Sequence, residues 1–271
     1  MPELPEVETS VRALREPLLG ETFSEARIYW PRHIDRPDPQ SFQERIAGLR
    51  VQKIRRRGKY MIFELTGGET LIIHLRMTGH VSVVERDAPL REHTHTILGL
   101  ASGKELRFHD TRKFGRMYLV RDPQEVLGKL GPEPLEKDFT PEALARQLAR
   151  RSMRLKPLLL DQSFVAGVGN IYADEALYYA GLHPERPANT LGGSEIKSLH
   201  AAIQKVLRMG IEREGASIDR YRKPDGGRGE MQNAVAVFRR TGEPCYHCGV
   251  AIERIVLSGR STHFCPVCQI P

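Results

Sequence analysis

Residues 60–76, YMIFELTGGETLIIHLR, consist of two apolar runs on either side of a glycine-rich turn. The runs cover 60–65 and 70–76, and Thr66-Gly67-Gly68-Glu69 separates them. Short runs rich in β-branched and aromatic residues around such a turn are typical of an antiparallel hairpin. This stretch therefore predicts that the surrounding part of the chain is built from β-strands.

More strand candidates follow the hairpin at short intervals. They cover 80–84, 96–100, 105–109 and 116–120, and a second turn lies at Ala101-Ser102-Gly103-Lys104. Strands this short and this closely spaced indicate a β-sandwich or a barrel, and of the two we expect the sandwich.

The N-terminal side of this region has a helical pattern. Four apolar residues recur there at helical spacing: Val7, Val11, Leu14 and Leu18. The pattern predicts an amphipathic helix over 3–16, with Pro5 in the first turn, where a missing amide hydrogen costs little. We expect this helix to pack against an edge or end of the sandwich.

The pattern changes again near Gly131-Pro132-Glu133-Pro134, where we place a domain boundary. Four helical segments follow. The first starts at Thr140-Pro141, and the other three cover 155–161, 170–180 and 194–212. Segment 215–230, rich in Gly, Arg and Asp, predicts a mobile loop, and 234–240 alternates like a strand.

These elements predict an α+β chain of two domains with a small metal-binding hairpin at its end. The expected ranges are 1–133 for the N-terminal β-sandwich with its helix, 134–229 for the helical part and 230–271 for the hairpin. A chain of 271 residues is long enough to give each domain its own core.

The charge of the chain is clustered. Lys and Arg number 41 against 34 Asp and Glu, a formal net charge of +7. The clusters lie at 53–59, 146–156, 220–228 and 239–260. One such run is usually a solvated face, but four favour a polyanionic partner, with nucleic acid first. No strongly basic amphipathic helix, transmembrane run or signal peptide is present, so we expect no membrane binding and a cytosolic or nuclear protein.

The four cysteines form two close pairs near the end of the chain. Cys245 and Cys248 are separated by two residues, as are Cys265 and Cys268, and sixteen residues lie between the pairs. Two thiolate pairs around a short hairpin are typical of one structural zinc ion. The alternatives are two disulfides or unconnected thiols. Arginines 254 and 260 of this hairpin are placed to contact a phosphate or a DNA groove.

Pro2 offers covalent chemistry if Met1 is removed, because the proline nitrogen is then a free secondary amine. Such an amine attacks a sugar carbon and forms an iminium ion, which is an electron sink. Glu3 next to it is placed to move the protons. Many chains carry an unused proline at position 2, so this hypothesis needs support from the rest of the sequence.

Two glycine-flanked loops carry bulky side chains. Met77 lies in Arg76-Met77-Thr78-Gly79, and Arg112 and Phe114 lie in Asp110-Thr111-Arg112-Lys113-Phe114-Gly115. Enzymes that rotate a base out of a duplex need such wedges to fill the gap. Taken alone, Met77 and Phe114 are more simply interpreted as core residues.

Other candidates are weaker. Gly167-Val168-Gly169-Asn170 precedes a helix, and we expect Asn170 to be its N-cap. The exposed backbone amides at the start of this helix favour a phosphate. The candidate roles of Lys59 are a phosphate ligand or an acid. Those of His93 and His95 are hydrogen-bond donors to a phosphate or metal ligands. For all three the alternative is a plain surface residue without a function. No P-loop, dinucleotide fingerprint or Ser/His/Asp signature is present.

Together these motifs resemble the formamidopyrimidine-DNA glycosylase family, bifunctional enzymes that remove oxidised purines from DNA. The resemblance covers essentially the whole chain, and its motifs fall in family order. They are Pro2-Glu3-Leu4-Pro5-Glu6-Val7-Glu8-Thr9, Gly58-Lys59-Tyr60, His74 to Gly79, Asp110 to Gly115, Gly167 to Ala173 and the hairpin ending in Cys268-Gln269. Leu4, where the related endonuclease VIII group typically has glycine, points to purines.

The resemblance implies roles for the catalytic residues. Pro2 is expected to displace the damaged base at C1′ and form a Schiff base, and Glu3 to open the sugar ring by protonation. Lys59 is expected to assist β-elimination and Arg260, on the zinc finger, δ-elimination. Glu6 is expected to order the site. The four cysteines are then the ligands of one structural zinc.

The resemblance also implies the DNA contacts. These residues are His74, His93, Arg112, Arg151 and Asn170, with Met77, Arg112 and Phe114 filling the vacated stack. Segment 215–230 is expected to fold over the extruded base, and the middle range becomes a helix-two-turn-helix DNA-binding domain. One departure is visible: Phe238-Arg239-Arg240 stands where the family usually has aromatic-Gly-Arg.

The expected partner is double-stranded DNA that contains oxidised purines or abasic sites, bound by a monomer in the cytoplasm, at the nucleoid in a bacterium. Two other hypotheses stay open. The chain is a DNA-binding module without chemistry, or a damage sensor that has lost catalysis. The presence of Pro2, Glu3 and Lys59 disfavours the second.

Overall fold

The computed structural model describes residues 1–218 and 221–270. The chain divides into two compact units. The N-terminal unit contains 1–129 and 213–230, and the C-terminal unit contains 130–212 and the part from Met231 onwards. Segment 213–230 therefore belongs to the N-terminal unit although its neighbours in sequence belong to the other. Two residues of the predicted loop at 215–230, positions 219 and 220, lie outside the described residues.

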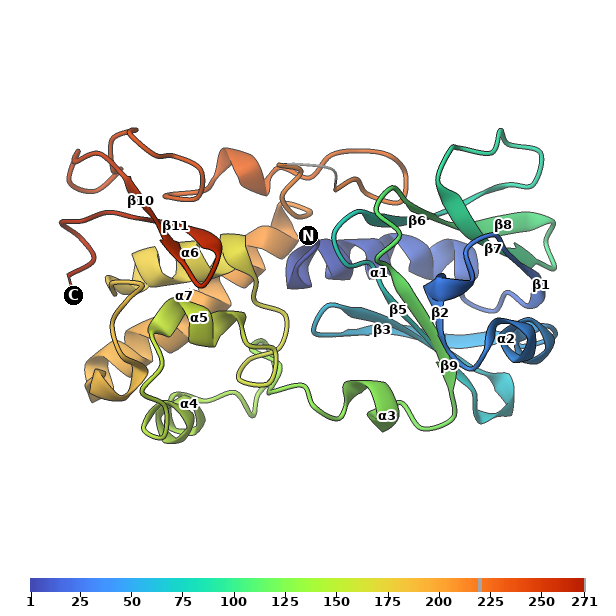
Figure 1. Cartoon of the computed structure of the whole chain (residues 1–271), viewed down its shortest axis with the longest axis horizontal. Helices are drawn as coiled ribbons and strands as arrows, with labels where there is room; N and C mark the ends of the chain where they lie inside the picture. The colour runs from blue at the N-terminus through green and yellow to red at the C-terminus, as the bar shows by residue number, and fades with distance from the viewer. Residues whose placement is uncertain (219–220, 271) are drawn as a thin grey trace. The chain divides into compact units, whose positions relative to one another are not determined.

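The N-terminal unit is a sandwich of two sheets (Figure 1). One sheet has the order β1-β7-β8-β6, formed by β1 (Phe23–Ile28), β7 (Thr94–Leu100), β8 (Lys104–Asp110) and β6 (Gly79–Glu85). The other has the order β2-β9-β5-β4-β3, formed by β2 (Ile34–Arg36), β9 (Arg116–Val120), β5 (Thr70–His74), β4 (Tyr60–Leu65) and β3 (Val51–Arg57). All pairings are antiparallel except β2 with β9.

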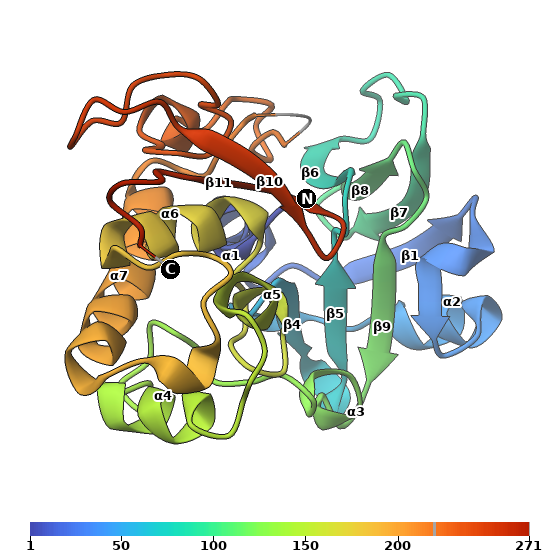
Figure 2. The same cartoon turned by 60° about the vertical axis from the view of Figure 1, so that its left-hand side comes forward.

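The stretch that predicts β-structure is confirmed as the hairpin β4–β5, whose register pairs Tyr60 with His74 and Glu64 with Thr70 (Figure 2). The predicted strands at 80–84, 96–100, 105–109 and 116–120 correspond to β6, β7, β8 and β9. The α+β class with an N-terminal sandwich is therefore confirmed.

Helix α1 (Leu4–Leu18) completes the core of this unit. Val7, Val11 and Leu14 are buried in one apolar cluster with side chains of both sheets. The helix contacts β3 and β6, an edge strand of each sheet, as the sequence predicts, and also the inner strand β4. Its first turn contains Pro5, and its N-cap is Glu3. The helix thus fixes the start of the chain against the sandwich.

Several elements have no clear sequence signal. They are β1, β2, β3 and two short helices, α2 (Pro39–Ile46) and α3 (Gln124–Leu127). β3 contains most of the basic cluster at 53–59 and buries only Val51 and Ile54. It is an edge strand in which Arg55 pairs with Glu64 at 2.6 Å. An edge strand with charged side chains resists pairing with other chains, but it lacks the alternation that would reveal it.

The C-terminal unit contains the helices and the metal-binding hairpin. Its elements are α4 (Pro141–Leu148), α5 (Leu155–Leu160), α6 (Asn170–Ala180), α7 (Gly193–Glu212), β10 (Glu253–Leu257) and β11 (Arg260–Phe264). α6 packs against α7, and Gly210 allows this because a Cβ there would lie 2.5 Å from the Tyr172 hydroxyl. β11 lies beside α6 (Figure 2).

The predicted strand at 234–240 is wrong. The described chain forms turns there, and the reason is Glu175 of α6. Its buried carboxylate accepts the backbone amides of Ala236, Val237 and Phe238 at 2.7–2.9 Å, so these donors have no need of a neighbouring strand. Within the described residues no helix is both long and apolar enough to cross a bilayer.

Candidate functional site

The start of the chain lies at the first turn of α1. Pro2 and Glu3 are buried in the N-terminal unit, whereas Met1 is 49% exposed. The bond between Met1 and Pro2 is therefore the point at which the chain leaves the protein interior. Removal of Met1 places a proline amine at this point, beside the Glu3 carboxyl group.

Glu6 holds this start of the chain in place. Its Oε2 accepts the Glu3 backbone N–H at 2.8 Å, and its Oε1 accepts the backbone N–H of Ala216 at 2.7 Å. The Tyr221 hydroxyl donates to the Glu6 backbone carbonyl at 3.2 Å. Burial and the Glu6 charge raise the pKa of Tyr221, so it remains a donor at neutral pH.

Lys59 lies in the tight turn between β3 and β4, where Gly58 has a positive φ of 55°. Its side chain is buried, at 5% exposure. A solvated surface position for Lys59 is therefore wrong. A buried ammonium in a turn is held in one place, as a group that moves a proton must be.

His74 is the neighbour of this turn at the end of β5. Burial, with the positive charges of Arg76 and Lys59, lowers the pKa of His74 to about 3. Its Nδ1 accepts the Arg76 backbone N–H at 3.0 Å. The ring is therefore neutral at physiological pH, with its proton on Nε2 as a donor. Tyr60 packs edge-on against the ring at 4.5 Å.

Met77, Arg112 and Phe114 form one exposed cluster. Met77 is 39% and Phe114 44% exposed, so the interpretation of these two as core residues is wrong. The Arg112 guanidinium lies 4.7 Å from the centre of the Phe114 ring and contacts the Met77 sulfur at 3.1 Å. The two predicted wedge loops therefore present one joint surface.

A buried carboxylate fixes both wedge loops. Asp110 bonds the Thr78 hydroxyl and accepts the backbone amides of Arg112 at 3.2 Å and Gly115 at 2.7 Å. Burial opposes ionisation, but the His33 ring, whose Nε2 lies 3.8 Å from Asp110 Oδ2, and these hydrogen bonds outweigh it, and the pKa of Asp110 lies well below its usual range. A carboxylate that remains charged keeps the two loops in register.

Two further predicted DNA contacts, His93 and Arg151, lie in different units. His93, in the N-terminal unit, has a 38% exposed side chain and a left-handed φ of 66°, and its ring lies 6.0 Å from that of His109. Arg151 is exposed just after α4, in the C-terminal unit. Both are accessible to a solvent-borne phosphate.

Asn170 is the first residue of α6, and its expected role as the N-cap is wrong. Gly169 is the N-cap. The Asn170 Nδ2 donates instead to the Ser261 carbonyl at 3.1 Å, and its Oδ1 is buried with no hydrogen bond from the part of the chain that the structure describes. The side chain thus connects the helix start to the hairpin β10–β11.

Arg260 is exposed at the tip of this hairpin, next to a turn in which Ser258 and Gly259 have positive φ. The following residue, Ser261, is held from inside. Lys156 is fully buried and donates to the Ser261 carbonyl at 2.6 Å while it pairs with Asp174 at 2.6 Å.

The other oxygen of Asp174 completes this anchor, because it accepts the backbone N–H of His263 at 3.0 Å. Lys156 belongs to the basic cluster at 146–156, for which the sequence predicts a polyanionic partner. For Lys156 this prediction is wrong, because its side chain is buried in an ion pair. The apolar residues around it, Leu155, Leu158 and Leu159, are the sequence signal for its burial.

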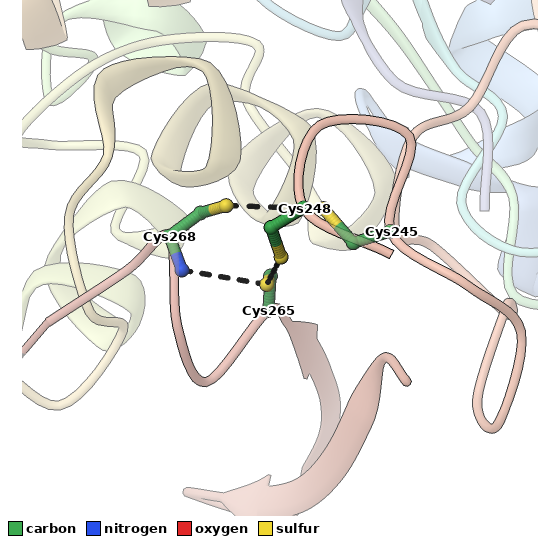
Figure 3. Close-up of side chains that lie close together, drawn as sticks. All are labelled: Cys245, Cys248, Cys265 and Cys268. Carbon is green, nitrogen blue, oxygen red and sulfur yellow. Dashed lines mark hydrogen bonds between the residues drawn. The ribbon is translucent and has the colours of Figure 1, made fainter. Parts of the chain in front are cut away.

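The four cysteines come together at the base of the hairpin (Figure 3). Their sulfur atoms lie within 4.8 Å of one another, with 3.4 Å between Cys248 and Cys265 and 3.9 Å between Cys245 and Cys268. A tetrahedral zinc ion with bonds of about 2.3 Å separates its sulfur ligands by about 3.8 Å. Disulfides require about 2.05 Å. The four sulfur positions fit one structural zinc and exclude the disulfide alternative.

Comparison with known families covers most of the chain. The model described as the formamidopyrimidine-DNA glycosylase N-terminal domain matches residues 1–117. The helix-two-turn-helix domain of the same family matches 130–222, and a zinc finger found in these enzymes and in isoleucyl-tRNA synthetases matches 242–270.

Similar proteins span the full length. A formamidopyrimidine-DNA glycosylase of Herpetosiphon aurantiacus is 52% identical over 99% of this chain and all of its own length. A Lactococcus lactis FPG mutant, solved with DNA containing Fapy-dG, is 40% identical over 99% of both chains with a TM-score of 0.93. The MutM (FPG) protein of Thermus thermophilus is 43% identical over 99% of this chain and 98% of its own, with a TM-score of 0.90.

Proposed function

The chain belongs to the formamidopyrimidine-DNA glycosylase family. From this premise we propose that it is a bifunctional DNA glycosylase and AP lyase of base excision repair, which removes oxidised purines such as 8-oxoguanine and formamidopyrimidines. The observation that carries the proposal is that Pro2 lies buried beside Glu3, at the point where the exposed Met1 leaves the protein interior. The proposed substrate of the protein is duplex DNA. The protein acts on it as a monomer, at the chromosome in the cytoplasm.

In the first step the Pro2 nitrogen lone pair forms a bond to C1′ of the damaged nucleotide. The C1′–N bond to the base breaks, and the base leaves with its electron pair and takes up a proton. Glu3 protonates the ring oxygen, so the sugar opens and the nitrogen–carbon bond becomes an iminium. A free α-amino group titrates near pH 8, so part of the amine is unprotonated and nucleophilic near pH 7.

The iminium then drives strand cleavage. Loss of a proton from C2′ sends electrons toward the iminium and expels the 3′ phosphate by β-elimination. A second elimination expels the 5′ phosphate. Lys59, buried in its turn, assists the first elimination, and Arg260, at the hairpin tip, assists the second. Both eliminations break C–O bonds without water as the attacking group.

The remaining residues bind DNA. His74 offers an Nε2 donor, and His93, Arg112, Arg151 and Asn170 contact the backbone. The cluster of Met77, Arg112 and Phe114 fills the stack that the extruded base leaves, which suits its exposure. Unstacking costs a few kcal/mol, and the wedge side chains offset part of this.

Zinc holds the finger that carries Arg260. The cysteines at 245, 248, 265 and 268 would hold it, and four protein ligands would leave no position open for substrate, so its role would be structural. Its binding contributes folding free energy to a hairpin too small to fold alone.

One gel tests this function. Purified protein without added metal or nucleotide is incubated with a duplex that contains one 8-oxoguanine. We expect incision at the lesion that leaves phosphates on both sides of the gap, and no incision of the undamaged duplex. Salt-dependent binding with no cut of either duplex would instead support a DNA-binding module without chemistry.

A further inference from the structure

Segment 213–230 closes on itself at its base. The Glu230 N–H donates to the Arg213 carbonyl at 2.7 Å, and the Gly229 N–H donates to the Ser217 hydroxyl at 3.0 Å. A Cβ on Gly229 would lie 2.2 Å from the Gly215 carbonyl, so only glycine permits this approach. We call residues 213–217 with 229–230 the neck of the segment.

The neck is fastened to Glu6 of α1, because the Ala216 N–H donates to Glu6 Oε1 at 2.7 Å. Gly215 is part of the same contact. It has a φ of +83°, and a Cβ on it would lie 2.9 Å from both Cγ and Oε1 of Glu6. Position 215 is therefore glycine for two reasons, its backbone conformation and the closeness of Glu6.

The second oxygen of the same carboxylate holds the reacting end of the chain. Glu6 Oε2 accepts the Glu3 N–H at 2.8 Å, and Glu6 is only 2% exposed. A carboxylate accepts a bond at each oxygen, and both bonds are strengthened by its charge. One rigid group thus lies between the neck and the residue that follows Pro2.

We propose that Glu6 is a positioning residue that transmits the placement of segment 213–230 to Glu3 and Pro2. A base held by the segment then favours the arrangement in which the amine and the acid meet the sugar. This inference rests on the proposed function and on the expectation, implied by the family resemblance, that residues 215–230 fold over the extruded base. It makes base recognition and nucleophile placement one coupled event.

Two substrates separate the coupling from the chemistry. An abasic duplex has no base for the segment to hold, so its incision depends on the catalytic residues and not on a base held by the segment. Ala216→Pro removes the N–H that bonds to Glu6 and leaves the bond to Glu3. We expect base release from 8-oxoguanine duplex to slow by about 10- to 100-fold at saturating enzyme, the factor for one hydrogen bond to a charged group. Incision of the abasic duplex stays close to wild type.

A double-mutant cycle identifies Glu6 as the transmitter. Glu6→Gln has a single acceptor oxygen in place of two and should slow both substrates. In this background Ala216→Pro should add little, because the transmitting group is already lost. Gly215→Ala, which strains the neck against Glu6, should behave like Ala216→Pro. Thermal unfolding of each variant confirms that it is folded.

The matched control is Glu125→Gln, which removes the exposed ion pair of Glu125 with Arg36 in the same unit but outside segment 213–230. It should leave both rates unchanged. Equal slowing of both substrates by Ala216→Pro, or effects that multiply with those of Glu6→Gln, would overturn the coupling. A wild-type protein that cuts neither duplex would instead refute the proposed function itself.

Discussion

Arg239 has a left-handed backbone, with φ of 60°. The family resemblance leads us to expect glycine at this position. The turn therefore has a backbone conformation that suits glycine, but the residue carries a side chain. The preceding amides, up to Phe238, are held by Glu175, and the next residue, Arg240, bonds to Glu243 at 2.8 Å. Fixed on both sides, Arg239 cannot relax to an ordinary φ.

This backbone strain predicts that glycine at position 239 gives a more stable protein than alanine does. Arg239→Gly should unfold with a free energy about 1 kcal/mol higher than Arg239→Ala, since only alanine retains the Cβ that opposes a left-handed backbone. Both variants lose the side chain, so its contacts cancel in the comparison. Urea denaturation followed by circular dichroism measures the difference. Equal unfolding free energies would show that the turn is unstrained.

Single residues differ in how well the sequence predicts them. The spacing predicts the zinc ligands, and the sulfur–sulfur distances then exclude the disulfide alternative. The burial of Met77, Phe114 and Lys156 does not follow from the sequence, because the two apolar side chains are exposed and the charged one is buried in an ion pair. The burial of a residue depends on which elements pack over it, and a local sequence pattern does not specify that packing.

Elements with regular periodicity were predictable. The hairpin β4–β5 and the helices α1 and α7 match their expected ranges closely because one face of each is continuously apolar. Helix α6 also matches, but it buries Asp174 and Glu175, and its range was expected from the Gly169-Asn170 start. The edge strand β3 was not, because its side chains are mostly charged. The turns at 234–240 were mistaken for a strand because their amides bond to a side chain from a distant helix.

The anchor between α5, α6 and β11 makes a prediction at this scale. Lys156→Met leaves Asp174 buried without its cation and should lower the free energy of unfolding by about 3–5 kcal/mol. Because Ser261 also loses a donor, the hairpin tip should loosen, and abasic duplex should then yield more β- than β,δ-elimination product. Chemical denaturation and product analysis on gels measure the two effects.

The doubly neutral variant is the control. Lys156→Met with Asp174→Asn removes both charges and should recover much of the lost stability, because a buried pair replaced as a whole costs little. A single variant that is no less stable than the double one would show that the pair contributes nothing to the fold of this unit.

At the scale of the whole molecule, the sequence indicates two folding parts but not their composition. The chain returns to the N-terminal unit for 213–230 after the helices of the other unit, and this return follows from contacts with Glu6 and His80. The bond between Ala216 and Glu6 joins positions 210 residues apart, which periodicity does not report. The clustered positive charge, in contrast, already indicated a nucleic-acid partner.

The central claim is that the amine of Pro2 bonds to deoxyribose. Borohydride is added while the protein reacts with an 8-oxoguanine duplex, and the reduced protein–DNA adduct is digested and sequenced by mass spectrometry. We predict an adduct on the Pro2 nitrogen of a chain that lacks Met1. An adduct on Lys59 or any other side chain, or full incision by protein that retains Met1, would contradict the account.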